Sequence, residues 1–165
     1  TMNAYISAFF ADLKVDAITI NPLMGSDVMQ PVQERNAFAF VLCLTSNPSA
    51  ADFLKEGMAE KIAYWLQNYP QENFGAVVGA TYSANLKTMR NLLLNRILLI
   101  PGIGAQGGDL KTVLQEAKDS FATPNILVNS SRGIIFASRG KDFASAARKE
   151  ARRLTREMKN ALSQE

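Results

Sequence analysis

The feature that most restricts the fold is a regular alternation of short apolar runs with longer amphipathic stretches. Five runs have the length and the apolar or β-branched character of strands: 16–21, 38–44, 74–80, 96–103 and 125–129. Between them, apolar residues recur at helical spacing, most clearly in 84–93, 110–118 and 142–162. Because the strands are apolar on both faces, this alternation predicts an α/β fold with a parallel sheet.

Two architectures have this alternation. A doubly wound open sheet suits a chain of 165 residues, whereas a closed (β/α)8 barrel typically needs ~250. No low-complexity segment or linker interrupts residues 1–165, which predicts a single domain. In the first segment, Tyr5, Ala8, Phe9 and Leu13 share one side of a helical period, and no strand precedes them. Length alone favours the open sheet.

Composition restricts the chemistry. The sequence has no histidine and a single cysteine, Cys43, which lies in an apolar run. The lack of histidine argues against a zinc site or a Ser-His triad. A lone cysteine forms no intrachain disulfide, so we expect a reducing compartment, the cytoplasm. No apolar run approaches the ~20 residues of a membrane span, and no membrane partner is expected.

Positive charge is concentrated near the C-terminus. Residues 132–165 hold nine Lys/Arg against four Asp/Glu, whereas residues 1–131 hold nine against eleven. A basic helix could bind nucleic acid, but no aromatic residue lies among the arginines from Arg148 to Arg156. Apolar residues recur between these arginines at helical spacing, so we expect the outer face of a helix and no nucleic-acid partner.

A glycine-rich turn, Pro101-Gly-Ile-Gly-Ala-Gln-Gly-Gly108, lies where an apolar run ends and a helix is expected to begin. Glycines such as Gly104 let backbone N–H groups approach an anion, and Gln106 offers one more hydrogen bond. Such turns also serve as plain connections, so this one alone is a weak indication of a site.

A second turn, Asn129-Ser-Ser-Arg-Gly-Ile134, occupies the same position one unit later. The Arg132 guanidinium suits a phosphate, and Gly133 offers an unobstructed N–H. Two anion-binding turns after the last two strands match the phosphate site that (β/α)8 barrels build after strands seven and eight. The pair therefore predicts a phosphorylated ligand.

Polar residues at the ends of two other strands are further candidates for ligand contacts. Ser46 belongs to the Thr45-Ser46-Asn47 segment, and Asn21 follows the first predicted strand. Ser46 or Ser49 could equally cap the helix that follows. Asn21 is a weaker candidate than the two glycine turns.

Five sequence blocks resemble one family: DAITINPLMGSD at 16–27, LCLTSNPSA at 42–50, VVGATY at 77–82, IPGIGAQGGD at 100–109 and NSSRGIIFAS at 129–138. In this order they resemble the orotidine 5'-phosphate decarboxylase family, in its longer bacterial branch. The resemblance implies a homodimeric (β/α)8 barrel, of which this chain forms the C-terminal part, about strands four to eight with the third to eighth helices. It overrules the length argument, and it implies conversion of orotidine 5'-phosphate to uridine 5'-phosphate (UMP) without metal or organic cofactor.

The resemblance also implies roles for particular residues. Gln106, Arg132 and the amide of Gly133 would hold the substrate phosphate. Ser46 would contact the pyrimidine, and Thr1 matches a threonine that reaches the ribose across the dimer interface.

The family's catalytic motif, Asp-x-Lys-x-x-Asp, does not occur in residues 1–165. In the family it lies immediately before the position of Thr1, and the segment 12–16 (DLKVD) has the wrong spacing, so Lys14 is not predicted to be catalytic. We expect the chain to be inactive by itself and to need an N-terminal barrel segment. We also expect 16–21 and 125–129 to be the outermost strands.

Two other interpretations remain open. The chain could belong to a phosphosugar enzyme related to hexulose-phosphate synthases, which shares the phosphate turns. Alternatively, it could be a noncatalytic phosphate-binding or assembly module. A comparison of nucleotide binding with pentose phosphate binding distinguishes the phosphosugar enzyme from the decarboxylase.

Overall fold

A computed structural model describes residues 2–54, 57–80, 83–103, 109–118 and 125–162, so Thr1, Gly104 and Gln106 lie outside the described residues. Within these residues the sheet has five strands: β1 Ile18–Ile20, β2 Ala39–Leu44, β3 Phe74–Val78, β4 Leu98–Pro101 and β5 Ile126–Asn129. Each strand pairs in parallel with the next, in the order β1-β2-β3-β4-β5. The predicted parallel α/β fold is confirmed, and β1 and β5 are the outermost strands, as expected.

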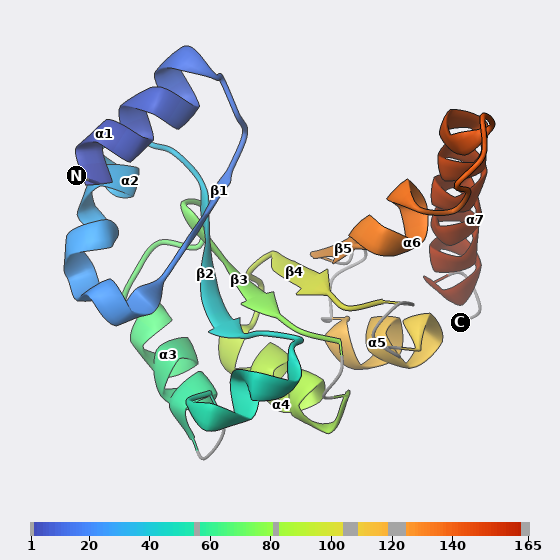
Figure 1. Ribbon diagram of the computed structural model, residues 1–165. Coiled ribbons are helices and arrows are strands. Elements are labelled where there is room, and N and C mark those ends of the chain that lie inside the picture. The colour runs from blue at the N-terminus through green and yellow to red at the C-terminus, as the bar shows by residue number, and fades with distance from the viewer. Residues whose placement is uncertain (1, 55–56, 81–82, 104–108, 119–124, 163–165) are drawn as a thin grey trace.

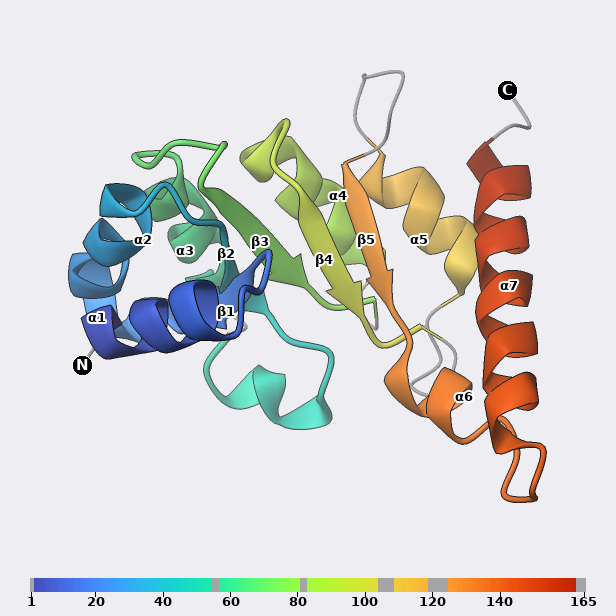
Figure 2. The same ribbon diagram turned by 90° about the horizontal axis from the view of Figure 1, so that it is seen from above.

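The strand order decides between the two architectures. A doubly wound sheet reverses its order at a switch point and carries helices on both faces, whereas a barrel adds each strand beside the previous one. Here the order never reverses. The helices α3 (Met58–Leu66), α4 (Ser83–Leu93) and α5 (Leu110–Ala117) cover one face of the sheet (Figures 1 and 2). The chain therefore forms part of a (β/α)8 barrel.

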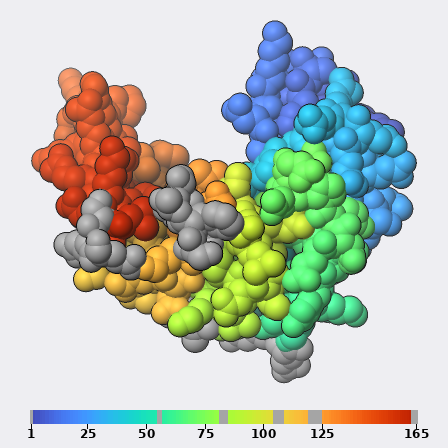
Figure 3. Space-filling view, turned by 180° about the vertical axis from the view of Figure 1, so that it is seen from behind, coloured from blue at the N-terminus to red at the C-terminus, as the bar shows by residue number. Residues whose placement is uncertain are grey.

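Further helical elements flank the sheet on both sides. Before and after β1 lie α1 (Met2–Ile6), a π-helical turn (Ser7–Asp12), a 3-10 segment (Pro22–Val28) and α2 (Gln30–Glu34). After β5 lie α6 (Ser131–Ile135) and α7 (Phe143–Leu162). Figure 3 shows the molecule hollowed between these N-terminal and C-terminal segments. The segments next to β1 and those next to β5 are thus separated by an open space, as expected for a barrel that is not closed.

The core lies where the central strands meet the helices. Val41 of β2 and Ala76 and Val78 of β3 have no exposed surface, and Leu86 and Met89 of α4 are equally buried. In the first segment, Ile6 is buried and packs with Met2 and Phe10 against the core. The Tyr5 and Leu13 side of that segment is exposed by 61% and 66%.

Several helix predictions need correction. The helix predicted after β2 is two elements, a 3-10 turn (Pro48–Asp52) and α3, because Gly57 adopts a left-handed φ of 90° immediately before α3. The helical spacing of 142–162 places Phe143 on the apolar face that we expect to be buried, yet Phe143 is 61% exposed at the start of α7. Met24 lies in an apolar stretch of the sequence that would suit the core, yet it is 66% exposed.

Two arginines are buried at the amino ends of the strands. Arg96 donates hydrogen bonds to the carbonyl oxygens of Leu66, Tyr69, Pro70 and Phe74. Arg90 donates to the carbonyl oxygens of Leu94, Arg96, Ala117 and Asn125. Burial lowers the pKa of Arg96, but a guanidinium starts so high that it stays charged. These hydrogen bonds tie the start of β4 to the starts of β3 and β5.

Within the described residues, none of the helices combines the length and apolar character that a bilayer crossing requires.

Candidate functional site

The candidate site is a pocket at the carboxyl ends of the strands. Its volume is about 150 Å³. The lining comes from the residues that follow β2, β4 and β5: Ser46, Pro101, Gly102, Ile103, Asn129, Ser130, Ser131, Arg132 and Gly133. Ligand pockets usually measure ~300–1,000 Å³, so a space of this size suits one group of a ligand, such as a phosphate. The two predicted anion-binding turns therefore share one pocket.

The turn after β5 brings donors into this pocket. The Ser131 hydroxyl donates to Asn129 Oδ1 at 3.0 Å, which fixes the start of α6. A Cβ at Gly133 would lie 2.9 Å from the Ser130 hydroxyl oxygen, so a glycine here lets that hydroxyl lie close to the backbone. Arg132 is exposed, and none of the described residues forms a hydrogen bond or ion pair with its side chain.

Ser46 reaches the pocket because a glycine, Gly79, follows β3. A Cβ at Gly79 would lie 2.7 Å from both N and Cα of Ser46. Gly79 N also donates to the Leu44 carbonyl at 2.8 Å. The chain after β2 therefore packs directly on the backbone after β3, and this contact carries Ser46 toward the turns after β4 and β5.

The turn after β4 begins with a left-handed glycine, and the helix that follows the turn begins with a capping aspartate. Gly102 has a φ of 100°, a value that favours glycine over other residues. Farther along, Asp109 caps α5 by accepting hydrogen bonds from Thr112 N at 2.9 Å and Thr112 Oγ1 at 2.6 Å. The Thr112 hydroxyl and amide hold the pKa of Asp109 below its usual value. Asp109 is thus a helix cap, and it does not line the pocket.

Asn21 lies elsewhere. Its side-chain oxygen accepts from Leu23 N at 3.0 Å and so caps the 3-10 segment that follows β1. It lines a separate space of about 250 Å³ with Thr45 and Asn47, and it also borders a larger cavity beside β1. The structure therefore brings Ser46, Arg132 and Gly133 together but places Asn21 outside their pocket.

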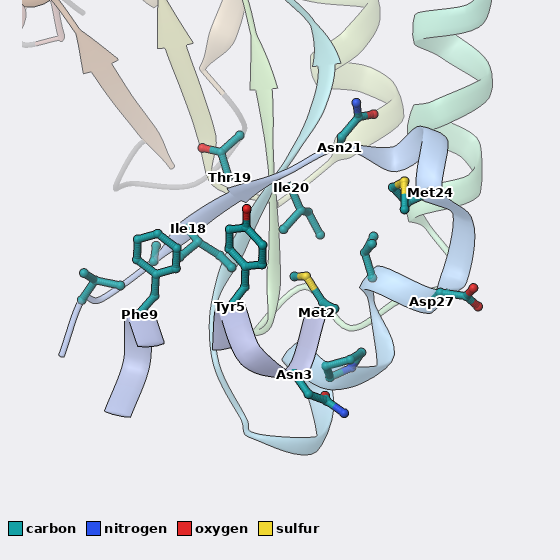
Figure 4. Close-up of a pocket in the computed structure, with 14 residues that line it drawn as sticks. Met2, Asn3, Tyr5, Phe9, Ile18, Thr19, Ile20, Asn21, Met24 and Asp27 are labelled. Atoms are coloured by element: carbon teal, nitrogen blue, oxygen red, sulfur yellow. The ribbon is translucent and has the colours of Figure 1, made fainter. Parts of the chain in front are cut away.

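The larger cavity measures about 840 Å³ and follows the outer edge of β1. Tyr5 and Phe9 project from the first helical segment toward Ile18 of β1 (Figure 4). Their rings stack with centroids 6.0 Å apart. The lining is mainly apolar, so this cavity has the character of an uncovered core rather than of a polar site.

The pocket at the carboxyl ends presents hydroxyls, amides and a guanidinium. No aspartate or glutamate is among the described residues that line it. Likewise, the part of the chain that the structure describes contains no cluster of His, Cys, Asp or Glu able to hold a metal ion. Donors without a carboxylate suit an anionic ligand.

Sequence reasoning found most of this pocket but missed two features. Glycine is needed at position 79 because of a contact with Ser46, thirty-three residues earlier in the chain. No local sequence pattern indicates such a contact. The buried arginines at the opposite end of the sheet were also missed. The only sequence signal for Arg96 is a charged residue at the start of an apolar run.

Comparisons with known proteins agree with this geometry. The family model described as "Orotidine 5'-phosphate decarboxylase / HUMPS family" matches residues 1–149. The curated orotidine 5'-phosphate decarboxylase of Leptospira interrogans is 42% identical over 166 residues, covering 96% of this chain and 58% of the relative. That of Herpetosiphon aurantiacus is 43% identical over 165 residues, covering 92% and 58%. The chain thus spans about three-fifths of the length of these relatives.

Solved structures give the same result. Leishmania donovani OMP decarboxylase superimposes with a TM-score of 0.77 at 31% identity, covering 98% of this chain and 63% of that one. Leishmania donovani UMP synthase has a TM-score of 0.77 at 34% identity, covering 95% and 36%. A family model that matches most of the chain, curated relatives above 40% identity and a shared barrel fold lead to one conclusion: the chain belongs to the orotidine 5'-phosphate decarboxylase / HUMPS family.

Proposed function

We propose that this chain is the phosphate-binding part of an orotidine 5'-phosphate decarboxylase, which converts orotidine 5'-phosphate to UMP and carbon dioxide. The observation that carries the proposal is the shared pocket of Ser46, the turn after β4 and the turn after β5. Family membership and the decarboxylase names of the curated relatives support the same activity.

In this proposal the phosphate is bound by Arg132, by the amide of Gly133 and by Gln106. The exposed Arg132 guanidinium offers paired donors that match phosphate oxygens. Glycine at position 133 leaves its N–H open to the ligand. Gly104 belongs to the same turn as Gln106 and would let the backbone approach the anion.

The other end of the nucleotide lies toward Ser46, whose hydroxyl would hydrogen-bond the pyrimidine. Ser46 borders the same pocket as Arg132, so a ligand whose phosphate fills the pocket could extend past it toward Ser46. The proposed protein is a cytoplasmic homodimer. Thr1, at the position of a family threonine, would reach across the dimer interface to the ribose of the nucleotide bound by the second protomer. Asn21, which caps a 3-10 segment outside the pocket, is the weakest candidate for a ligand contact.

The proposal assigns the proton donor to a different segment. Residues 1–165 contain no Asp-x-Lys-x-x-Asp motif. Phosphate binding supplies remote binding energy, but decarboxylation also needs charges that are preorganised at the reacting carbon. We therefore propose that residues 1–165 alone are inactive.

The cavity beside β1 is the proposed docking position of the motif-bearing segment. Tyr5 and Met24, which line this cavity, are each more than 60% exposed. A preceding strand that pairs with β1 would cover this apolar surface and place its carboxyl end near Asn21. The segment would thus be both a structural and a catalytic partner.

Thermal unfolding with and without UMP tests the phosphate site. We expect UMP to raise the unfolding temperature of the protein that contains this chain, because a ligand that binds only the folded state stabilises it. Arg132→Ala should remove that rise. An equal rise in parent and variant would contradict the assigned phosphate contact.

Complementation tests the division of roles. The chain alone should release no carbon dioxide from orotidine 5'-phosphate, and addition of a barrel segment with the Asp-x-Lys-x-x-Asp motif should restore release. A motif variant with Lys→Ala is the matched control. Activity of the chain alone would overturn the proposed dependence on the motif.

The family model's name covers a second group of enzymes, which keeps a phosphosugar substrate as the alternative. Ribose 5-phosphate carries the phosphate without the base. A protein that binds ribose 5-phosphate as tightly as UMP would favour this alternative over the decarboxylase, and a protein that binds neither would favour a noncatalytic assembly module.

A further inference from the structure

The contact between Gly79 and Ser46 is unusually close. A Cβ at position 79 would lie 2.7 Å from the N and Cα atoms of Ser46 and 2.9 Å from its Cβ. Real Cβ atoms essentially never approach within 3.0 Å of another heavy atom, and here the nearest atoms are backbone. Gly79 does not have a positive φ. Glycine is therefore needed here for space, because the backbone of Ser46 occupies the place of a side chain.

The next residue holds the opposite wall of the pocket. Ala80 N donates to the Pro101 carbonyl oxygen at 2.9 Å, directly before the left-handed Gly102. Gly79 N meanwhile donates to the Leu44 carbonyl at 2.8 Å. Two consecutive amides after β3 thus fix the chain that leads to Ser46 and the chain that starts the turn after β4.

We propose that Gly79 is a positioning residue: together with the Ala80 amide, it sets the separation between Ser46 and the phosphate-binding turns. This inference rests on the proposed function, since it assumes that Ser46 contacts the base and that the turns hold the phosphate. Gly79 is not among the described residues that line the pocket. Because it has no side chain, Gly79 lets the Ser46 backbone come close, and this close approach sets the separation of Ser46 from Pro101 and Gly102.

This arrangement has a consequence for specificity. A nucleotide monophosphate must engage Ser46 and the turns at the same time, whereas ribose 5-phosphate needs the turns alone. We expect a methyl group at position 79 to push the Ser46 backbone away, because the three atoms nearest to it all belong to Ser46. The preference for nucleotide over sugar phosphate therefore depends on this glycine.

The test measures equilibrium binding of UMP, ribose 5-phosphate and inorganic phosphate to the full-length protein that contains this chain. For Gly79→Ala we expect UMP binding to weaken by about tenfold, the size of one lost hydrogen bond. Binding of ribose 5-phosphate and of phosphate should change less than about threefold, because the hydrogen bond from Ala80 N to the Pro101 carbonyl oxygen still holds the start of the turn after β4.

Gly75→Ala is the matched control, because it makes the same substitution in the same β3 region, at the other end. A Cβ there would lie 2.6 Å from the Ile97 carbonyl oxygen and 2.8 Å from the Phe40 ring, far from the pocket. We expect Gly75→Ala to lower the unfolding temperature but to keep the parent ratio of UMP to ribose 5-phosphate affinity. An equal change of this ratio in both variants would overturn the inference.

A double-mutant cycle shows whether Gly79 acts through Ser46. In a Ser46→Ala background, Gly79→Ala should weaken UMP binding less than about twofold, because the contact that it displaces is already gone. Additive losses would overturn the inference, and so would a Gly79→Ala protein that does not fold.

The outcomes separate this inference from the proposed function. If the parent protein binds UMP more tightly than ribose 5-phosphate and Gly79→Ala keeps that preference, the positioning role is wrong and the proposed function stands. If the parent binds neither ligand, both are wrong.

Discussion

The two ends of the sheet use the same side chain in opposite ways. At the amino ends of the strands, Arg90 and Arg96 are 4% and 6% exposed, and backbone carbonyl oxygens surround both guanidinium groups. At the carboxyl ends, Arg132 is exposed and lines the candidate pocket. A guanidinium whose donors bind the backbone holds the fold together, whereas an exposed one keeps its donors for a ligand. The amino ends of the strands thus hold an arginine pair that stabilises the fold, and the carboxyl ends leave a guanidinium open to a ligand, the end at which barrels of this class place their active sites.

The largest effect is expected at the amino ends. Arg96→Met should lower the free energy of unfolding by at least about 3 kcal/mol, because it leaves four carbonyl oxygens without their charged donor in a buried setting. Urea unfolding monitored by circular dichroism measures this change. UMP affinity at temperatures where the variant is folded should stay near that of the parent.

Arg96→Lys is the control for charge. Lysine keeps the positive charge but cannot reach all four acceptors in the planar arrangement of a guanidinium, so the variant should stay clearly less stable than the parent. A fully stable Arg96→Lys protein would show that charge alone matters at this end.

Between the two ends lies Cys43 in β2, with no exposed surface. Burial raises the pKa of its thiol to about 12, from the ordinary value of 9.0. Above pH 9 the unfolded chain releases this proton and the folded chain does not, so stability should fall as pH rises from 9 toward 12. The slope is about 1.4 kcal/mol per pH unit.

Urea unfolding of parent and Cys43→Ala proteins across pH 8 to 11 measures this slope. The difference between the two proteins should narrow as pH rises, because only the parent has the thiol. A difference independent of pH would mean that the thiol ionises as readily in the folded protein as in the unfolded chain.

A smaller effect is expected at Asp109, on the carboxyl side. Hydrogen bonds from Thr112 lower the pKa of its carboxyl group, so its contribution to stability is present above the ordinary pKa of 3.8 and is lost as pH falls below that value. Asp109→Asn keeps an effective cap but should remove this acid dependence. Thermal unfolding between pH 3 and 6 checks it, and identical profiles for parent and variant would contradict the assignment.

The smallest effect on stability is expected at Arg132. Without ligand, Arg132→Ala should change the free energy of unfolding by less than about 0.5 kcal/mol, because its side chain is exposed and has no partner among the described residues. The same urea experiment measures it beside Arg96→Met. A loss as large as that of Arg96→Met would break the contrast between the two ends.

The order of the elements could be predicted from sequence because each depends on a local pattern. The apolar runs that form β2 and β3 have the length of strands and precede stretches with helical spacing. The turns after β4 and β5 are indicated by their glycines. For the same reason Ser46, Arg132 and Gly133 could be placed at strand ends before any coordinates were known.

Other features could not be predicted, because they depend on distant partners. The four acceptors of Arg96 lie 22 to 30 residues earlier in the chain. The first helix is a second case: its period places Tyr5 and Leu13 together on one side, yet both are exposed and the buried residue is Ile6. Periodicity shows which residues share a face, but only neighbouring elements decide which face is covered.

The strand order also has a consequence for synthesis. Each strand pairs with the strand that precedes it in the sequence. During synthesis, the pairing partner of each new strand has therefore already left the ribosome. Arg96 can bind its acceptors as soon as it emerges, since all of them precede it. Arg90 must wait for the Asn125 carbonyl, thirty-five residues later, so its last hydrogen bond is completed only when translation reaches β5.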